Sequence, residues 1–209
     1  MNSAANLAES CTAMAFGTPI STHQWADADA LNAGLRARIL AAERADKGVL
    51  RSNIGGWHSA PDLLASDDPH VAAFKARLIR YARDLTALVI ADPARKLDMK
   101  IDAWANVSRD GDYNGVHDHP GAHWSGVYYV SAGTPAPNAN PHNAMLELLD
   151  PRVGVNMLAL PGSVFEGRYL IAPLPGLMVF FPSWIKHLVH PFRGEGERIS
   201  ISWNIEITG

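Results

Sequence analysis

The feature that most constrains the fold of this chain is a change in hydrophobic period near residue 97. Before it, apolar residues repeat at helical spacing; after it, apolar and polar residues alternate in short runs separated by Gly, Pro and Asn clusters. Helices followed by many short strands are typical of an antiparallel sandwich or jelly roll with helices on one sheet. The predicted strands are 96–107, 124–130, 144–149, 169–171, 177–181, 185–191 and 198–207.

Two helices are predicted in the first half of the chain. One covers about 27–46, where apolar residues recur at helical spacing and Gly48 follows as a stop. The other begins after Asp67 or Asp68 as a cap, has Pro69 in its first turn and ends near 91–93. A short strand is also expected at 14–20.

The composition indicates one ordinary globular domain. With 209 residues, 47% apolar and 19% charged, the chain is long enough for one well-filled core. We expect a single domain over 1–209, with helical support over roughly 24–92 and a β core over roughly 97–207. The net charge of -3, with both signs interspersed, argues against a nucleic-acid partner or an anionic membrane.

The N-terminus and the cysteine content indicate where the protein works. Cys11 is the only cysteine, so an internal disulfide and a cysteine-based metal site are both excluded. The first residues lack a basic segment followed by an apolar one, and no apolar run has the length of a membrane span. We expect a soluble, cytoplasmic protein.

The sequence His117-Asp118-His119 precedes an aromatic run and could chelate a metal. In a strand, residues two apart point to the same face, so the two histidines would converge and Asp118 would point away from the metal. Asp118 would then either bond a neighbour at the mouth of the pocket or face water. Such a pair is weakly specific by itself. Its weight comes from His187, which follows a buried strand and a short turn, and from Arg198 eleven residues later.

Arg198 opens the run RISISWN, which alternates strictly. An alternating run places polar and apolar side chains on opposite faces of a strand, and we expect the polar face to line a cavity. An arginine at the start of that face suits a bidentate grip on a carboxylate. The polar face comprises Arg198, Ser200, Ser202 and Asn204, and the apolar face Ile199, Ile201 and Trp203.

The stretches RSNIGGWHS, HDHPGAHWSGVYYV, LLDPR, GLMVFFPSWIKHLVHPF and RISISWN resemble the 2-oxoglutarate- and Fe(II)-dependent oxygenases of the prolyl-hydroxylase-like kind. Within that superfamily, the chain looks like a family of bacterial and phage proteins of mostly unassigned substrate, with a His-x-His…His pattern. The resemblance extends from about residue 14 to the C-terminus. It implies a mostly β fold, a double-stranded β-helix (jelly roll) with two helices packed on one sheet.

The resemblance also implies the cofactors and the residues that hold them. It assigns Fe(II) to His117, His119 and His187, and the 5-carboxylate of the co-substrate 2-oxoglutarate to Arg198. Tyr129 looks like the residue whose hydroxyl helps hold that carboxylate. Ser125 and Val127 would face inward with Tyr129, and Ser200 would line the same site. The implied reaction hydroxylates an unidentified substrate while 2-oxoglutarate is decarboxylated to succinate.

The metal ligands depart from the usual triad of two histidines and one carboxylate. His119 stands where an Asp or Glu is expected, and no His-x-Asp or His-x-Glu occurs in the chain. The resembling family shares this form, so we interpret the set as a three-histidine face. Three neutral imidazoles leave the full double charge on the ion. That favours an anionic bidentate ligand such as 2-oxoglutarate, and zinc is an alternative metal.

Two other functions fit part of the pattern. A cupin-type metal enzyme also uses His-x-His in a jelly roll, and Gly111 suits a cupin opening. However, His123 and Trp124 stand where a cupin would have a Glu, and no Gly precedes His187 at the cupin spacing. The second alternative is a non-catalytic domain that binds metal or 2-oxoglutarate. The substrate, small-molecule or amino-acid-like, cannot be identified from the sequence; an exposed sheet edge is compatible with a homodimer.

The remaining candidates are weaker. The Gly-rich segment 51–59 is expected to be a loop, either a pocket wall or a segment pinned to the core by Trp57. Trp104 and Asn106 share a strand face just before the metal segment and could line the pocket, although the core is the default expectation for Trp104. His123 could lie near the site or face solvent, and His190 should point away from it. His23, His58, His70 and His142 are interpreted as surface or loop residues.

Overall fold

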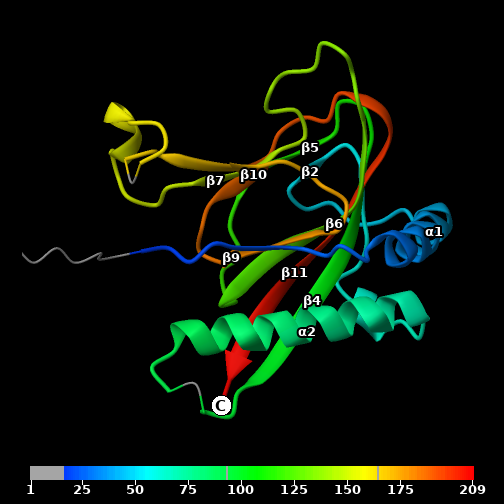
Figure 1. The fold of residues 1–209 in the computed structure, drawn as a ribbon. Helices are drawn as coiled ribbons and strands as arrows, with labels where there is room; N and C mark the ends of the chain where they lie inside the picture. Colours follow the sequence, from blue (N-terminus) through cyan, green and yellow to red (C-terminus); the bar gives the residue numbers. More distant parts are fainter. Residues whose placement is uncertain (1–16, 93, 164) are drawn as a thin grey trace, which may run out of the picture.

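Two antiparallel sheets form the body of the protein in a computed structural model that describes residues 17–92, 94–163 and 165–209 (Figure 1). One sheet has the order β1-β9-β6-β11-β4-β3 and the other β2-β5-β10-β7-β8. The strands are β1 (Ser21–Gln24), β2 (Asn53–Ile54), β3 (Trp57–His58), β4 (Asp98–Ser108), β5 (Tyr113–His117), β6 (Trp124–Pro135), β7 (Leu146–Leu149), β8 (Arg168–Ile171), β9 (Leu177–Pro182), β10 (His187–Val189) and β11 (Gly194–Thr208).

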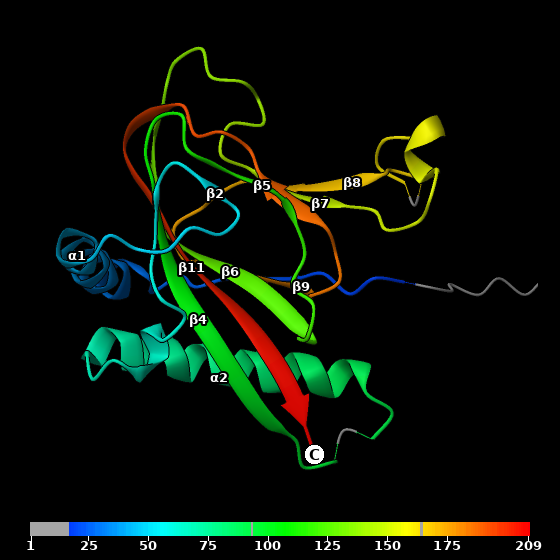
Figure 2. The same ribbon diagram turned by 180° about the vertical axis from the view of Figure 1, so that it is seen from behind.

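Two helices cover the outer face of the six-stranded sheet, as predicted. They are α1 (Asp29–Ala45) and α2 (Pro69–Val89), and two 3-10 turns, η2 (Leu63–Ala65) and η3 (Val155–Leu158), complete the helical elements of the described ranges. The Asp68 carboxylate caps α2 by accepting from the backbone N–H groups of residues 70 and 71. Figure 2 shows α2 crossing β4 and β11 on the side away from β5 and β7. Neither described helix contains a segment both apolar and long enough to span a bilayer.

The apolar side chains form two layers because every long strand of the six-stranded sheet alternates. One layer lies between that sheet and the helices, and its largest member is Trp203, which is fully buried. The other lies between the two sheets and includes Tyr129 and Phe181. The central strand β11 pairs along most of its length with β4 on one side and β6 on the other. One face of β11 therefore packs in the core against the helices, and the other face points into the space between the sheets.

The segment expected to be a loop at 51–59 is a link between the two sheets. Its strand β2 pairs with β5 in one sheet, and its strand β3 pairs with β4 in the other. Gly55 and Gly56 join them with φ of 69° and 63°, a conformation that side chains other than glycine rarely adopt. Trp57 is buried in the core, as one of the two interpretations expected. The link closes one side of the space between the sheets.

Two strand assignments from the sequence need correction. Residues 14–16 of the strand expected at 14–20 lie outside the described residues, and 17–20 are not in a strand. The strand is instead β1, the polar run at Ser21–Gln24, which pairs with β9. It was missed because an edge strand with a polar face lacks an apolar signature. Strand β5, Tyr113–His117, was missed because its segment carries turn-forming Asn and Gly.

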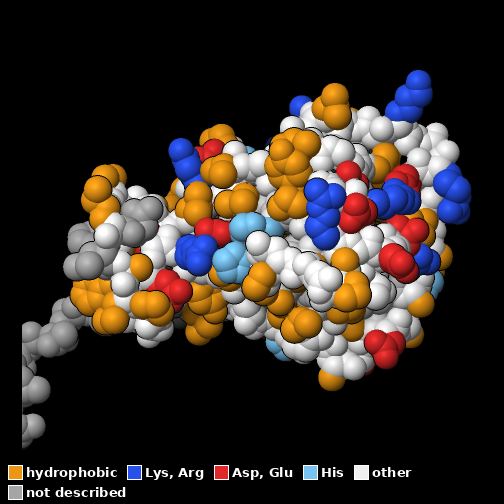
Figure 3. Space-filling model, turned by 90° about the horizontal axis from the view of Figure 1, so that it is seen from above, with side chains coloured by type: hydrophobic (Ala, Val, Ile, Leu, Met, Phe, Trp, Pro, Cys, Tyr) orange, Lys and Arg blue, Asp and Glu red, His pale blue; other side chains and the backbone are white. Residues whose placement is uncertain are grey.

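The connection between β7 and β8 projects from the body and exposes apolar side chains. Val153, Met157 and Leu160 are exposed, as is Phe165. Figure 3 shows hydrophobic side chains gathered on this projecting segment. The sequence prediction of a loop here is correct, but it did not indicate an apolar surface.

Gly126 supplies a stability test of the central sheet. It lies on β6 opposite Phe180 of β9. An added Cβ would lie 2.3 Å from the Val179 carbonyl oxygen and 2.5 Å from the Trp203 ring. Because strand pairing and the core fix both neighbours, we expect Gly126→Ala to lower the free energy of unfolding by about 1–3 kcal/mol in urea denaturation.

The matched control for this substitution is Gly17→Ala. A Cβ at Gly17 would meet nothing within 4 Å, so its effect should stay within about 0.5 kcal/mol. Equal stabilities of the Gly126→Ala variant and the wild type would contradict the packing of β6 between β9 and β11.

Candidate metal centre and cavity

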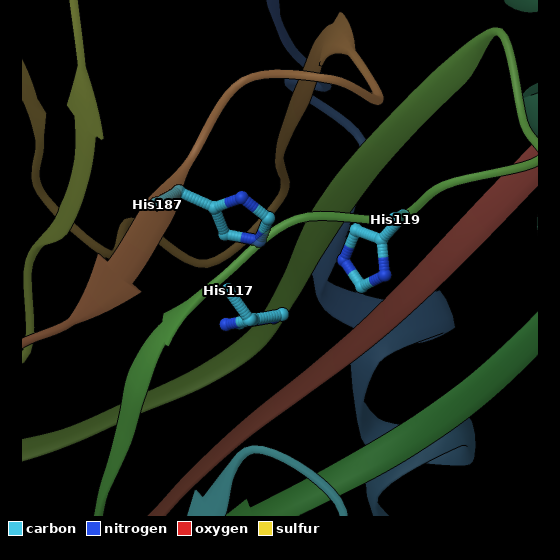
Figure 4. A group of neighbouring side chains, drawn as sticks. All are labelled: His117, His119 and His187. Carbon is cyan, nitrogen blue, oxygen red and sulfur yellow. The ribbon is translucent and has the colours of Figure 1, made fainter.

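Three histidines from separate parts of the chain meet between the sheets. His117 ends β5, His187 begins β10, and the two are paired across these strands. His119 comes from the segment after β5. Their ligand atoms all lie within 4.8 Å of one another, and within the described ranges no other group of three or more His, Cys, Asp or Glu is arranged in this way. Figure 4 shows the three rings around one common space.

The local reason for this convergence differs from the expected one. Strand β5 stops at His117, so His119 lies beyond the ladder, where its N–H donates to the Ser183 carbonyl at 3.0 Å. The alternation of a strand does not apply there, and the expectation that Asp118 points away is wrong. Asp118 lines the same cavity as the three histidines, with an exposed side chain.

Hydrogen bonds fix the tautomers of two of the rings. The Nδ1–H of His117 donates to the Gly115 carbonyl at 2.8 Å, and that of His187 donates to the Ile185 carbonyl at 2.9 Å. Because a carbonyl oxygen can only accept, Nδ1 carries the proton and Nε2 keeps its lone pair. Histidines that bind a metal through one ring nitrogen typically donate the N–H of the other to an acceptor such as a carbonyl oxygen.

The protonation of the cluster also suits a metal. Burial, with a smaller contribution from the neighbouring His117, lowers the pKa of His119 to about 4. Burial likewise lowers the pKa of His187 to about 3, with His117 adding to the effect and the bond to Ile185 opposing it. Burial also lowers the pKa of His117. All three rings are therefore neutral at neutral pH and offer lone pairs.

The donor set fits a divalent transition metal. Imidazole nitrogens suit Zn, Cu, Fe and Ni, and no carboxylate belongs to the group. Two nitrogens at ~2.1 Å from one ion can be at most about 4.2 Å apart, so small side-chain rotations bring these atoms into range. Three protein ligands leave further coordination positions for a bound molecule.

A cavity of about 400 Å³ opens from this cluster. The polar face of β11 lines it, while Ile199, Ile201 and Trp203 lie in the core on the opposite face, so the predicted division of this strand is confirmed. Trp104 and Asn106 of β4 also line the cavity. The expectation of Trp104 in the core is therefore wrong, because the even-numbered positions of this part of β4 face the second sheet.

A buried cation lies at one end of the cavity. Arg198 is 2% exposed and forms no ion pair with any described residue, and Tyr129 beside it is fully buried. The guanidinium carbon lies 5.3 Å from the centre of the Tyr129 ring. Among the described residues, neither the Arg198 Nε nor the Tyr129 hydroxyl has a hydrogen-bond partner. A buried charge without an acidic partner is costly, so this end of the cavity suits an anion with several acceptor oxygens.

The electrostatics of this pair follow from burial. Burial lowers the pKa of the Arg198 guanidinium, and the contact with Tyr129 opposes that shift. Burial raises the pKa of the Tyr129 hydroxyl, and Arg198 opposes this shift in turn. The hydroxyl keeps its proton at neutral pH and can donate it in a hydrogen bond to an anion.

The other predicted site residues divide between the cavity and its surroundings. Ser200 and Val127 line the cavity. Ser125 is buried outside its lining and donates to the Asn204 side chain at 2.7 Å. His123 accepts from the backbone N–H of residue 207, and His190 lies 2.6 Å from the Glu147 carboxylate; neither lines the cavity.

Sequence reasoning missed His58. It was interpreted as a surface or loop residue, but it is 6% exposed and lines the cavity. A usable signal was present in the sequence. Trp57 and His58 follow the Gly-Gly turn as two neighbouring strand residues, and when the Trp is in the core the His must face the opposite side.

Comparisons with known proteins define the class of fold. The structure is similar to a Pseudomonas putida prolyl-4-hydroxylase (18% identity, 92% of this chain and 94% of that chain, TM-score 0.61). It is also similar to Streptomyces hygroscopicus HygX with nickel and 2-oxoglutarate bound (15% identity, 90% and 83%, TM-score 0.61). A third match is a Trichoplax adhaerens prolyl hydroxylase (14% identity, 90% and 83%, TM-score 0.58). The predicted double-stranded β-helix fold is thereby confirmed.

The family comparison adds the class of enzyme. Residues 102–204 match the family described as "Putative 2OG-Fe(II) oxygenase". That range contains all three clustered histidines, Tyr129 and Arg198. The resemblance inferred from the sequence is confirmed, and the family and fold together indicate a 2-oxoglutarate- and Fe(II)-dependent oxygenase, an enzyme class. No curated protein sequence matches the chain.

Proposed function

We propose that the protein is a dioxygenase that hydroxylates a small or amino-acid-like substrate, with Fe(II) as its metal and 2-oxoglutarate as its co-substrate. The observation that carries this proposal is the pairing of two features in one cavity: three neutral histidines at one place and an unpaired, buried Arg198 at another. A dianion with a metal-chelating end and a distant carboxylate matches both features at once.

The roles of the residues follow from their contacts. The Nε2 atoms of His117 and His187 would bind the metal together with a ring nitrogen of His119, and the Nδ1 hydrogen bonds hold two of the rings in place. Arg198 would take the distal carboxylate in a two-point grip, and the Tyr129 hydroxyl would donate a hydrogen bond to it. Ser200, on the same strand face as Arg198, would line this pocket.

The metal supplies the oxidation chemistry that couples decarboxylation of 2-oxoglutarate to hydroxylation of a C–H bond. The protein supplies ligand geometry, an anchor for the co-substrate and a partly closed cavity. Three neutral ligands leave the double positive charge of the ion uncompensated, and bound 2-oxoglutarate offsets it. The HygX structures, which contain nickel with 2-oxoglutarate or iron, support this set of ligands. The family match favours it over a cupin-type metal enzyme.

The test is the dependence of 2-oxoglutarate binding on the metal. In thermal unfolding, 2-oxoglutarate should raise the melting temperature of the metal-loaded protein and leave the chelator-treated protein unchanged. A ligand at 100 times its Kd adds about 2.7 kcal/mol to the free energy of unfolding, so the shift should be several degrees. Glutarate, which lacks the keto group, is the matched control and should give a smaller shift.

Turnover separates an enzyme from a non-catalytic binding domain. With Fe(II), O₂ and 2-oxoglutarate, the protein should release succinate in amounts exceeding one equivalent per chain. Binding without succinate release in the presence of a broad substrate panel would leave the non-catalytic domain as the function. Absence of metal-dependent binding would refute the proposal.

A further inference from the structure

A second group of polar side chains lines the cavity and has no role in holding the metal or 2-oxoglutarate. It consists of His58, Arg51 and Asp118, with the Trp104 ring among them. Arg51 and Asp118 are exposed, whereas His58 is buried. We call these four residues the outer subsite.

His58 is held in one orientation and presents an acceptor atom. Its ring is stacked on Trp104, with centroids 5.4 Å apart and planes 13° apart. Its Nδ1–H donates to the Ser59 carbonyl at 2.7 Å, which leaves the lone pair on Nε2. No described residue donates to this Nε2. This Nε2 is accessible from the cavity, and an acceptor on a cavity wall without a protein donor suits a hydrogen-bond donor from a ligand.

The two charged members of the subsite have no partners within the described chain. Both side chains are exposed, and neither forms an ion pair with another described residue. Arg51 lies close enough to His58 to lower the pKa of its ring, after burial as the main cause. Asp118 and His58 both influence the pKa of His119. The positive, the negative and the acceptor group therefore line the same cavity, with Arg51 near His58 and both His58 and Asp118 near His119.

Trp104 places this end next to the metal cluster. Its ring centroid lies 5.8 Å from that of His119 and 5.4 Å from that of His58. A molecule held against the indole would therefore lie beside His119. The indole face also suits a neighbouring cation.

We propose that the outer subsite binds a free α-amino acid as the hydroxylation substrate, with its carboxylate on Arg51 and its ammonium on His58 Nε2 and Asp118. This proposal rests on the function proposed above. One molecule with a cation and an anion two bonds apart complements a cation, an anion and an acceptor on the same cavity wall.

The reaction balances with the named co-substrates. One C–H bond of the amino acid becomes C–OH, with the oxygen atom taken from O₂. The second oxygen atom enters succinate as 2-oxoglutarate loses CO₂, and 2-oxoglutarate supplies the two remaining electrons. The metal begins and ends as Fe(II).

The test is calorimetric binding to the full-length chain loaded with redox-inert Zn(II), with and without 2-oxoglutarate. The titrants are the twenty common amino acids and their N-acetyl and carboxamide derivatives. We expect at least one free amino acid to bind, and blocking either its amine or its carboxylate to weaken binding by at least about 10-fold, since each block removes one charged contact.

Substitutions in the outer subsite test which residue contacts which group of the amino acid. Arg51→Gln and Asp118→Asn should each weaken binding at least about 10-fold, and the matched controls Arg44→Gln and Asp98→Asn, outside the cavity, should have no effect. His58→Phe keeps a ring against Trp104 but removes the acceptor, and it should weaken binding while His58→Gln restores part of it. The Zn(II) and 2-oxoglutarate affinities of Arg51→Gln and of the two control variants should stay at the wild-type value, because Arg51 is the subsite residue with no direct effect on the pKa of a metal-binding ring.

The outcomes separate this inference from the proposed function. If 2-oxoglutarate binds but no free amino acid binds, or blocked derivatives bind equally well, the amino-acid subsite is wrong and the oxygenase assignment stands. If 2-oxoglutarate does not bind, the oxygenase assignment fails, and the titration without 2-oxoglutarate still decides whether the subsite takes an amino acid. Unchanged binding in both Arg51→Gln and Asp118→Asn would also overturn the subsite.

Discussion

Replacing His187 with alanine is expected to abolish metal binding. The wild-type chain should bind one divalent ion, measured by metal analysis after gel filtration, and the variant should bind none at the same concentration. Loss of a partner that merely orients a ligand costs 10–100-fold in metal affinity, so loss of a ligand itself should cost more than about 100-fold. His187 is the most buried of the three rings, which leaves water little access as a substitute ligand.

Two further variants serve as controls for the His187→Ala result. His187→Gln keeps most of the side-chain volume, so it separates loss of the imidazole from a cavity in the core. His142→Ala removes a histidine that lies outside the cavity lining and should bind metal like the wild type. Circular dichroism establishes that each variant is folded. If folded His187→Ala retains the iron content of the wild type, the three-histidine assignment is wrong.

Hydrophobic periodicity was sufficient to predict the elements that bury one face in the core. Helix α2 has a capping Asp68, Pro69 in its first turn and buried residues at helical spacing, so its start was predicted within one residue. Strand β11 alternates strictly, and both of its faces were assigned correctly. In each case the information is local, because the pattern repeats within a single element.

Hydrophobic periodicity failed to predict the direction of a side chain where that direction depends on the pairing or packing of another element. Asp118 was assigned to the wrong direction because the end of β5 at His117 is set by pairing with β10, some 70 residues further along the chain. Trp104 was assigned to the core because nothing in β4 itself indicates which face meets the helices. His58 was missed for a related reason: β3 has only two residues, too few for a pattern.

The convergence of the three histidines was predicted, but not from periodicity. Their positions in the chain gave no distances, and the expectation came from a resemblance to a known family. The pairing of His117 with His187 supplies the physical basis, because it places two imidazoles side by side from adjacent strands. His119 then reaches the same space through the short turn that follows, held by its bond to the Ser183 carbonyl.

Replacing Arg198 with methionine is expected to weaken 2-oxoglutarate binding without lowering the stability of the ligand-free protein. Methionine is apolar and of similar length, and it removes a buried charge that no described acidic residue pairs with. Replacing buried charges with apolar residues is often neutral or stabilising by about 1–4 kcal/mol, so the ligand-free variant should unfold in urea at an equal or higher concentration. Its affinity for 2-oxoglutarate should fall by about 2–5 kcal/mol, more than 30-fold, while its metal affinity stays unchanged.

The opposite signs make the prediction discriminating, because a residue that serves only the fold would lower stability when it is removed. Arg198→Lys keeps the charge but loses the two-point grip, so its affinity for 2-oxoglutarate should lie between those of wild type and methionine variant. Arg44→Met, on the exposed side of α1, is the control and should stay within about 0.5 kcal/mol in stability. A destabilisation of about 3–5 kcal/mol in Arg198→Met would mean that the guanidinium is paired inside the protein, and the case for an anion pocket would then be lost.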